Sequence, residues 1–340
     1  MTALQISNPG ELNLVDLEKA RAGRSQVVIR VVRGGICGSD MLIYHGKNPF
    51  ASYPRIPGHE FVGEVVENGE GSKKFKPGDR VVANPVVSCG NCYPCRIGRT
   101  NVCTSLQVIG VHRDGGFAQY IAVDESNLFR IPDSLSWDDA VFIEPFSIAA
   151  NVTSRIALDR SDRLLLIGAG PIGLTILQVA KMLGAKVAVC DMVGSRLVHA
   201  SGMGADMVIN TAKENIGARA AEFSDGDGPS AIIDAAGVPG LMAGLAGMAS
   251  PGGRIGILGF STSISEIAQY EITRKELTIA GSRLNNNKFP QVIEWMASGK
   301  LNPSSLLSRK FPIGEARKAF ELIDGNKETI LKVLLDLEAL

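Results

Sequence analysis

Short apolar runs separated by glycine and proline dominate the first 130 residues of the chain. They fall at 27–32, 61–66, 80–82 and 117–123 and are rich in valine, isoleucine and aromatic residues. Turn-forming residues lie between them. The pattern predicts an antiparallel, barrel-like domain at the amino-terminal end.

The pattern changes near residue 162, where apolar runs begin to alternate with helical segments. An apolar run at 164–167, a glycine turn, a helical stretch at 172–183 and a second run at 186–190 make one βαβ unit. Three more apolar runs follow, separated by helix-like segments, at 231–233, 254–258 and 277–280. This alternation predicts a doubly wound parallel sheet, so the fold class is α/β with a Rossmann domain.

The last part of the chain carries helical patterns around 291–297 and 315–323 and ends in an apolar run at 330–335. At about 55 residues it is small for a core of its own. We therefore expect it to pack on the first domain. The predicted divisions are 1–147, 148–284 and 285–340.

Length and composition agree with a globular protein of two domains. The 340 residues exceed what one ordinary core holds, and 45% are hydrophobic and 21% charged. Lysine plus arginine and aspartate plus glutamate balance at 35 each, so no overall charge draws the chain to nucleic acid or anionic lipid. No uncharged apolar window of about 18 residues and no secretion signal stand out. We expect a cytoplasmic protein whose ligand is a small molecule.

Four of the six cysteines lie close together, in a loop at about 88–104 that contains glycine and proline. They are Cys89, Cys92, Cys95 and Cys103, with the spacing C-x2-C-x2-C-x7-C. This spacing lets four thiolates surround one zinc ion, and a closed site of this kind leaves no place for substrate. The cysteines therefore predict a structural zinc.

A glycine-rich turn follows the run at 164–167 and opens the next helical stretch. It has the form G-x-G-x-x-G, and the residues expected to contact a cofactor are Gly168, Gly170, Pro171, Ile172 and Gly173. Backbone N–H groups and the helix dipole at such a turn hold a pyrophosphate. The turn therefore predicts a dinucleotide site.

Asp191 lies 23 residues after the first glycine, at the end of the next strand. A carboxylate there accepts hydrogen bonds from ribose hydroxyls and repels a 2′-phosphate, which favours NAD over NADP. The neighbouring Met192 brings no charge, whereas Arg196 either reaches the adenosine side of the cofactor or belongs to a solvated helix face.

A second metal site is predicted from isolated residues. Cys37 lies in a Gly-Ile-Cys-Gly-Ser-Asp segment, His59 in Gly-His-Glu, and Glu144 before Pro145 in an apolar stretch. Sulfur, imidazole and carboxylate give zinc three ligands and leave one position open. A cysteine and a histidine 22 positions apart are also common as structural residues.

The order of these motifs along the chain resembles the medium-chain zinc dehydrogenases over nearly its full length. The motifs run Cys-Gly-Ser-Asp, Gly-His-Glu, the four cysteines, Glu-Pro, Gly-x-Gly-x-x-Gly and Asp. The resemblance implies a GroES-like β-barrel catalytic domain, a Rossmann domain and a carboxy-terminal segment that returns to the first. It also implies a homodimer or homotetramer.

By the same resemblance, Cys37, His59 and Glu144 hold the catalytic zinc, and Glu60 lies close behind or exchanges into the coordination shell. Asp40 accepts a hydrogen bond from the His59 ring and fixes its tautomer. The family chemistry is zinc-dependent oxidation of a secondary alcohol to a ketone, with hydride transfer to NAD.

A proton relay is expected to begin at the Ser39 hydroxyl. Some relatives continue the relay with a histidine two positions after the aspartate, but that position is Leu42 in this chain. His45 is the nearest substitute.

Within the family the chain is most similar to the bacterial starvation-sensing RspB type and then to sorbitol and idonate dehydrogenases. The segments that support this are 45–50, 85–90, 110–117, 143–146 and 282–290. The resemblance implies a hexonate substrate such as L-gulonate. Arg283 and Asn285 are candidates to bind its carboxylate and hydroxyls, and His112 is a further one. Arg283 fits a salt bridge between domains nearly as well.

Two other functions stay open from the sequence. A neutral polyol dehydrogenase would use the same zinc and NAD. An NAD-binding sensor without turnover belongs to another class, although such a protein would not need the zinc ligands or the Ser39 hydroxyl.

Overall fold

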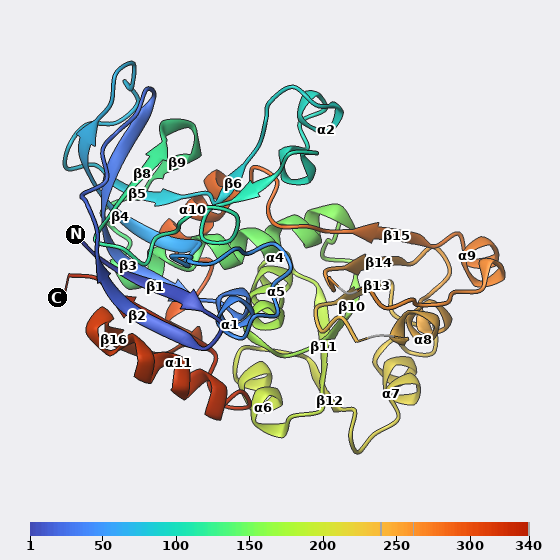
Figure 1. Cartoon of the computed structure of the whole chain (residues 1–340). Helices are drawn as coiled ribbons and strands as arrows, with labels where there is room; N and C mark the ends of the chain where they lie inside the picture. The colour runs from blue at the N-terminus through green and yellow to red at the C-terminus, as the bar shows by residue number, and fades with distance from the viewer. Residues whose placement is uncertain (239, 261, 339–340) are drawn as a thin grey trace. The chain divides into compact units, whose positions relative to one another are not determined.

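The computed structural model describes residues 1–238, 240–260 and 262–338 and divides into two compact units (Figure 1). The first unit consists of Met1–Glu144, Phe289–Gly299 and Pro303–Leu340. The second consists of Pro145–Lys288 and Lys300–Asn302. The carboxy-terminal strand and helix thus belong to the same compact unit as the amino terminus.

A seven-stranded, mainly antiparallel sheet forms the barrel of the first unit. Six strands follow the order β16-β17-β3-β4-β5-β9, and β8 pairs with β3. Their bounds are Leu307–Pro312, Lys332–Asp336, Gln26–Ile36, Glu60–Asn68, Arg80–Ala83 and Leu128–Arg130, with β8 at Tyr120–Asp124. The GroES-like barrel expected from the sequence is confirmed, and β16 and β17 form its one parallel pair within the described residues.

Strand β3 organises this sheet because three other strands pair with it. It is almost continuously buried, and β4, β8 and β17 all run antiparallel to it. Gly35 lies opposite Glu60 of β4 and opposite Leu334 of β17. The carboxy-terminal strand therefore meets the end of β3 directly before Cys37.

Shorter elements of the first unit surround the barrel. The other strands are β1 (Thr2–Asn8), β2 (Glu11–Asp16), β6 (Val86–Val87) and β7 (Gln107–Val108). The helices are α1 (Gly38–Tyr44), α2 (Tyr93–Arg96), α3 (Trp137–Ala140), α10 (Phe289–Ala297) and α11 (Ala316–Gly325). Helix α4 (Ile143–Arg155) has Glu144 in its first turn and belongs to the second unit from Pro145 onward. The loop that contains α2 extends away from the barrel (Figure 1).

A six-stranded parallel sheet forms the second unit. Its order is β12-β11-β10-β13-β14-β15, with strands at Met207–Asn210, Lys186–Asp191, Arg163–Ile167, Ala231–Asp234, Arg254–Ile257 and Thr278–Gly281. The helices between them are α5 (Pro171–Met182), α6 (Gly194–Gly202), α7 (Ile216–Phe223), α8 (Leu241–Met248) and α9 (Gln269–Lys275). The predicted Rossmann sheet is confirmed, and it contains one strand, β12, that no predicted apolar run covered.

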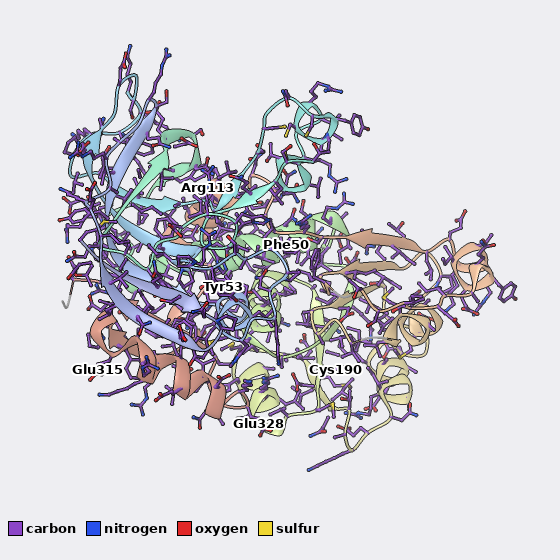
Figure 2. The ribbon with its side chains drawn as sticks, viewed as in Figure 1. Phe50, Tyr53, Arg113, Cys190, Glu315 and Glu328 are labelled. Atoms are coloured by element: carbon purple, nitrogen blue, oxygen red, sulfur yellow. The ribbon has the colours of Figure 1, made fainter. Side chains whose placement is uncertain are left out.

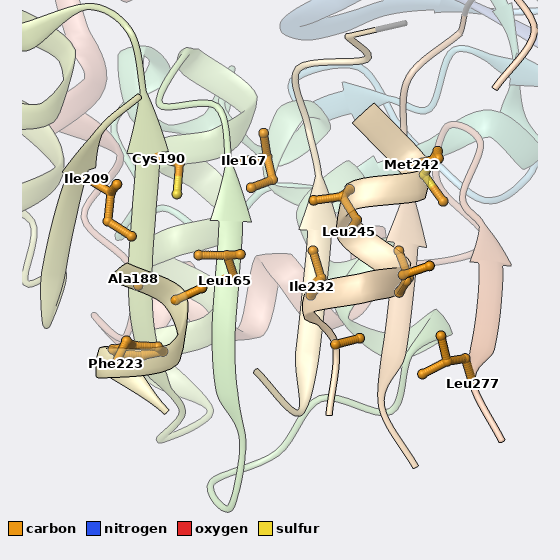
Figure 3. Packing of buried hydrophobic residues seen from close by; sticks show 14 residues of the cluster. Leu165, Ile167, Ala188, Cys190, Ile209, Phe223, Ile232, Met242, Leu245 and Leu277 are labelled. Carbon is orange, nitrogen blue, oxygen red and sulfur yellow. The ribbon is translucent and has the colours of Figure 1, made fainter. Parts of the chain in front are cut away.

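The core of the second unit lies between this sheet and its helices (Figure 3). Leu165, Ala188 and Ile232 from three neighbouring strands are fully buried and face Phe223 of α7 and other helix residues. Parallel strands covered by helices are expected to be apolar throughout, which explains the continuous apolar runs in the sequence. Among the described residues, no helix combines the length and the apolar character that crossing a membrane requires.

Replacing Ile232 with alanine should destabilise the second unit. The side chain is 0% exposed in the core, so the cavity left behind is expected to cost about 2–5 kcal/mol of unfolding free energy. Val198→Ala, at a helix position that is 71% exposed, should change it by less than about 0.5 kcal/mol. Denaturant unfolding followed by circular dichroism measures both, and equal effects of the two substitutions would contradict this core.

Candidate active site

The four clustered cysteines converge in the lobe around α2. Their sulfur atoms all lie within 4.8 Å of one another, with Cys92 Sγ 3.4 Å from Cys95 Sγ and 3.8 Å from Cys103 Sγ. Sulfur ligands about 2.3 Å from a tetrahedral zinc are roughly 3.8 Å apart. The donor set and its spacing therefore fit a four-thiolate zinc.

Backbone N–H groups of the lobe favour the thiolate form of two of these cysteines. Hydrogen bonds from the amides of Thr104 and Cys95 lower the pKa of Cys92 to about 5. Amides of Asn91 and Cys92 lower the pKa of Cys89. Because only a thiolate binds zinc, these amides prepare the lobe for metal.

A second cluster lies where β3 ends and β4 begins. Cys37 follows β3 and precedes α1, while His59 and Glu60 lie at the start of β4. One ligand atom from each of these three residues lies within 4.8 Å of the other two. His59 is 7% exposed and Glu60 is 0% exposed. The register of two antiparallel strands thus brings together residues that are more than 20 positions apart.

Asp40, in the first turn of α1, organises the loops of this cluster. It is fully buried, and its carboxylate accepts hydrogen bonds from the amides of Cys37 at 2.8 Å and Gly58 at 3.2 Å. Its Oδ1 lies 3.6 Å from Nδ1 of His59. Nδ1 therefore faces Asp40, which leaves Nε2 as the nitrogen for a metal.

The charged groups around His59 change the pKa of its imidazole ring. Burial lowers its pKa, but the charges of Asp40 and Cys37 outweigh burial and raise the pKa well above its ordinary value. Its buried Nδ1 has no hydrogen-bond partner among the described residues. A metal cation bound to Nε2 would be stabilised by the negative charges of Asp40 and Cys37.

Glu144, the predicted third ligand, is buried near the cluster, at 3% exposure. Burial raises its pKa to about 7, opposed by His59 and reinforced by Glu60. The carboxylate that lies within 4.8 Å of both the Cys37 and His59 ligand atoms is that of Glu60. The choice of Glu144 as third ligand therefore stays a prediction.

Lys332 is a residue of this site that sequence reasoning missed. Its ammonium group donates to both carboxylate oxygens of Glu60, at 2.7 and 2.6 Å. Both side chains are buried, at 5% and 0% exposure. A lysine inside the apolar run at 330–335 was the available signal, because a buried lysine needs a partner of opposite charge.

Ser39 lies beside Cys37 at the start of α1. Its Oγ is buried and has no hydrogen-bond partner among the described residues. Leu42, one helical turn further along, is 46% exposed. His45, the proposed relay substitute, has its Nε2 2.9 Å from the Asp324 carboxylate. The relay from Ser39 onward therefore stays a prediction.

The glycine turn of the second unit has the geometry of a dinucleotide site. Gly168 has a φ of +99°, and a Cβ at Gly173 would lie 1.9 Å from the carbonyl oxygen of Gly168. Gly170, directly before α5, faces open space. These are the three roles of the motif: the tight turn, close helix packing and backbone access to a pyrophosphate. Pro171 and Ile172 are the first two residues of α5, so N–H groups of its first turn remain for a ligand.

Asp191 ends strand β11 next to this turn. Its carboxylate accepts hydrogen bonds from the amides of Ala169 at 2.8 Å and Val193 at 2.9 Å. Arg196 Nη1 lies 3.6 Å from Asp191 Oδ2. The arginine therefore lies beside the carboxylate predicted to select the cofactor.

His112, a predicted substrate contact, lies in a loop that packs against the backbone before His59. Its ring stacks on Phe50 at a centroid distance of 5.5 Å, and its Nδ1 accepts a hydrogen bond from the Val108 amide at 3.1 Å. That bond leaves Nε2 as the protonated ring nitrogen in the neutral tautomer. Figure 2 labels Phe50 and the adjacent loop residue Arg113.

The other substrate candidates lie in the second unit. The Arg283 guanidinium lies 5.3 Å from the centre of the Phe260 ring, and Asn285 is buried. Asn151 of α4 donates to the Ser282 hydroxyl and to the Leu284 carbonyl, both at 3.0 Å. These bonds hold the backbone of the segment, and the roles of Arg283 and Asn285 stay predictions.

Known proteins match this chain along its whole length. The model of the alcohol dehydrogenase GroES-like domain matches residues 23–133, and that of the zinc-binding dehydrogenases matches 171–298. The starvation-sensing protein RspB of Escherichia coli K12 is 45% identical, covering 98% of this chain and 99% of that protein. The L-galactonate-5-dehydrogenase of the same strain is 33% identical, covering 98% of both. A solved alcohol dehydrogenase structure (rspB) from E. coli CFT073 with NADH has a TM-score of 0.95 at 44% identity, covering 99% of both chains.

Zinc content should separate the two cysteine sites. We expect two zinc ions per chain in the wild-type protein, and one in Cys37→Ala and in Cys103→Ala, because each substitution removes a ligand from one cluster. Cys190→Ala is the matched control, since that thiol is buried in the core of the second unit. Elemental analysis of the purified variants measures the zinc. Two zinc ions in Cys37→Ala would show that this cysteine is no ligand.

Proposed function

The chain belongs to the zinc-binding alcohol dehydrogenases, and on that premise we propose that it oxidises a secondary alcohol of a sugar acid to a ketone with NAD. As a member of this family it is an NAD-dependent, zinc-type alcohol dehydrogenase. The observation that carries the proposal is the group of Cys37, His59 and Glu60, in which the histidine and the glutamate are buried, in a chain that also carries the dinucleotide turn. We propose a homodimer or homotetramer as its assembly.

The metal site of the proposal consists of Cys37, His59 and Glu144 as ligands, with the Glu60 carboxylate close behind them. Nδ1 of His59 faces Asp40 and leaves Nε2 for a metal, and the anionic surroundings support a bound cation. A zinc ion at these residues would supply the Lewis acidity that lowers the pKa of a substrate hydroxyl. Asp40 holds the Cys37 amide and faces the His59 ring, so it fixes both ligands in place.

Ser39 is the first proton acceptor in the proposal. Its buried Oγ has a free lone pair for the substrate hydroxyl proton and a proton of its own to pass on. A serine hydroxyl is too weak a base to keep that proton, so it acts as a carrier. Leu42 carries no titratable group, and the proton therefore leaves by another route.

The cofactor site of the proposal consists of the glycine turn and Asp191. The first turn of α5 offers N–H groups to the pyrophosphate, and the Asp191 carboxylate accepts from the ribose hydroxyls. A negative charge at that position disfavours a 2′-phosphate, which supports NAD as the cofactor.

The substrate class is the least constrained part of the proposal. The name of one relative, L-galactonate-5-dehydrogenase, specifies a hexonate, which supports a sugar acid such as L-gulonate for this chain. A carboxylate needs a cationic partner, and Arg283 is the candidate. The His112 ring, with Nε2 protonated, and the Asn285 amide could donate hydrogen bonds to substrate hydroxyls.

Replacing Asp191 with serine should shift the cofactor preference toward NADP. The substitution removes the charge that repels a 2′-phosphate, and Arg196 already lies 3.6 Å from that carboxylate. We expect the NAD to NADP ratio of kcat/KM to fall by about 10- to 100-fold, the worth of one hydrogen bond to a charged group. The double variant Asp191→Ser/Arg196→Ala is the control, and its ratio should fall less because it lacks the arginine that would attract the 2′-phosphate. An unchanged ratio in the single variant would exclude this role of Asp191.

The substrate proposal is tested by following NADH formation with a panel of hexonates and neutral polyols. We expect turnover of a hexonate, its loss in Cys37→Ala, and a rise in KM equivalent to about 2 kcal/mol in Arg283→Ala, since a charge-assisted contact to the carboxylate is removed. Turnover of polyols alone, with Arg283→Ala unaffected, would replace the sugar acid by a polyol. No turnover of either set would favour a protein that binds NAD without catalysis.

A further inference from the structure

The ion pair with Lys332 engages both oxygen atoms of the Glu60 carboxylate, including the one that could bind a metal. Both Glu60 oxygens accept from the Lys332 ammonium, at 2.7 and 2.6 Å. One of them also lies within 4.8 Å of the ligand atoms of Cys37 and His59. Zinc ligands are typically about 3.5 Å apart. The same carboxylate is therefore available to the ammonium group and to a metal held by Cys37 and His59.

The space around the Glu60 carboxylate is built to hold it at the lysine. The carboxylate lies over Gly35 of β3, where a Cβ would come within 2.4 Å of Glu60 Oε2 and 3.0 Å of a Val141 methyl group. The absence of a side chain at Gly35 therefore makes room for the carboxylate. Lys332 Nζ also lies 3.4 Å from the Ile36 carbonyl, so it contacts the strand end that carries Cys37.

Lys332 is enclosed with the carboxylate. Its side chain is 5% exposed, and its ammonium group forms an ion pair at 2.6 Å with Glu60, whose side chain is 0% exposed. The amine comes from β17, whose pairing with β3 places Val333 opposite Ile36. The strand pairing therefore delivers a fixed positive charge to the cluster from a residue more than 270 positions away from Glu60.

We propose that Lys332 is a positioning residue that holds the Glu60 carboxylate out of the metal coordination shell and so keeps one coordination position open for substrate. The inference rests on the proposed zinc site. Lys332 then determines whether the Glu60 carboxylate stays beside the metal or occupies its last coordination position. A site closed by four protein ligands is structural, whereas a site with an open position is catalytic.

Lys332→Met tests this role, because methionine keeps much of the side-chain length and removes the charge. We expect Glu60 to become a metal ligand, so that zinc passes from this site to a chelator about tenfold more slowly or slower still. In the cobalt(II)-loaded variant the visible absorption bands should no longer shift when imidazole is added. The value of kcat should fall with the loss of the open position. Cys37→Ala provides the signal of the four-cysteine lobe, which is subtracted.

Two further variants distinguish zinc coordination by Glu60 from direct repulsion between Lys332 and the metal. Lys332→Arg keeps the charge and should retain the wild-type zinc release rate and cobalt spectrum. In a Glu60→Gln background, Lys332→Met should leave zinc release unchanged, because an amide ligates zinc poorly. If the lysine acted only by repelling the metal, its removal would slow release equally in both backgrounds.

The outcomes are distinct for the inference and for the proposed function. Slower release and a closed cobalt spectrum in Lys332→Met, both dependent on Glu60, support the inference. Unchanged or faster release in the folded variant, or an effect that persists without Glu60, overturns it. Failure of the wild-type protein to bind zinc at Cys37 would instead overturn the proposed function, and circular dichroism identifies any variant that does not fold.

Discussion

The burial of several acidic groups in one place is the constraint on which the first unit depends. Asp40, Glu60 and Glu144 are almost completely buried, and the Cys37 thiol lies with them. Removing an ion from water costs several kcal/mol unless an opposite charge compensates for it. Lys332 compensates for one of these groups, and a divalent metal is the natural compensation for the rest. The strand register, the turn before α1 and the carboxy-terminal strand all serve to hold this arrangement.

The second unit meets a different physical requirement, which is to hold the phosphate groups of a cofactor. The glycine turn presents backbone N–H groups, and the α5 dipole adds a partial positive charge. The neighbouring carboxylate of Asp191 is held by two amides and is the group predicted to select between NAD and NADP. In each unit the backbone thus fixes the orientation of the polar groups of the predicted site, which are the metal-site residues in the first unit and the cofactor-site residues in the second.

Local motifs were predictable from the sequence, whereas contacts set by strand register were not. The four cysteines and the glycine turn lie within short segments, so their spacing alone indicated their geometry. The ion pair of Glu60 with Lys332 depends on the pairing of β17 with β3, and the contact of His45 with Asp324 joins residues 279 positions apart. The placement of Glu60 within 4.8 Å of the Cys37 and His59 ligand atoms likewise depends on the start of β4. No periodicity encodes such contacts, although a lysine within an apolar run indicates that one exists.

Zinc-edge anomalous diffraction from crystals of the wild-type protein is the most direct test of the account. We predict two peaks in each chain, one among the four cysteines of the α2 lobe and one within about 2.3 Å of Cys37 Sγ and about 2.1 Å of a His59 ring nitrogen. The Glu60 carboxylate should remain on Lys332 at the second peak. A single peak, or a second peak away from Cys37 and His59, would contradict the assignment of this cluster as the metal centre of a dehydrogenase.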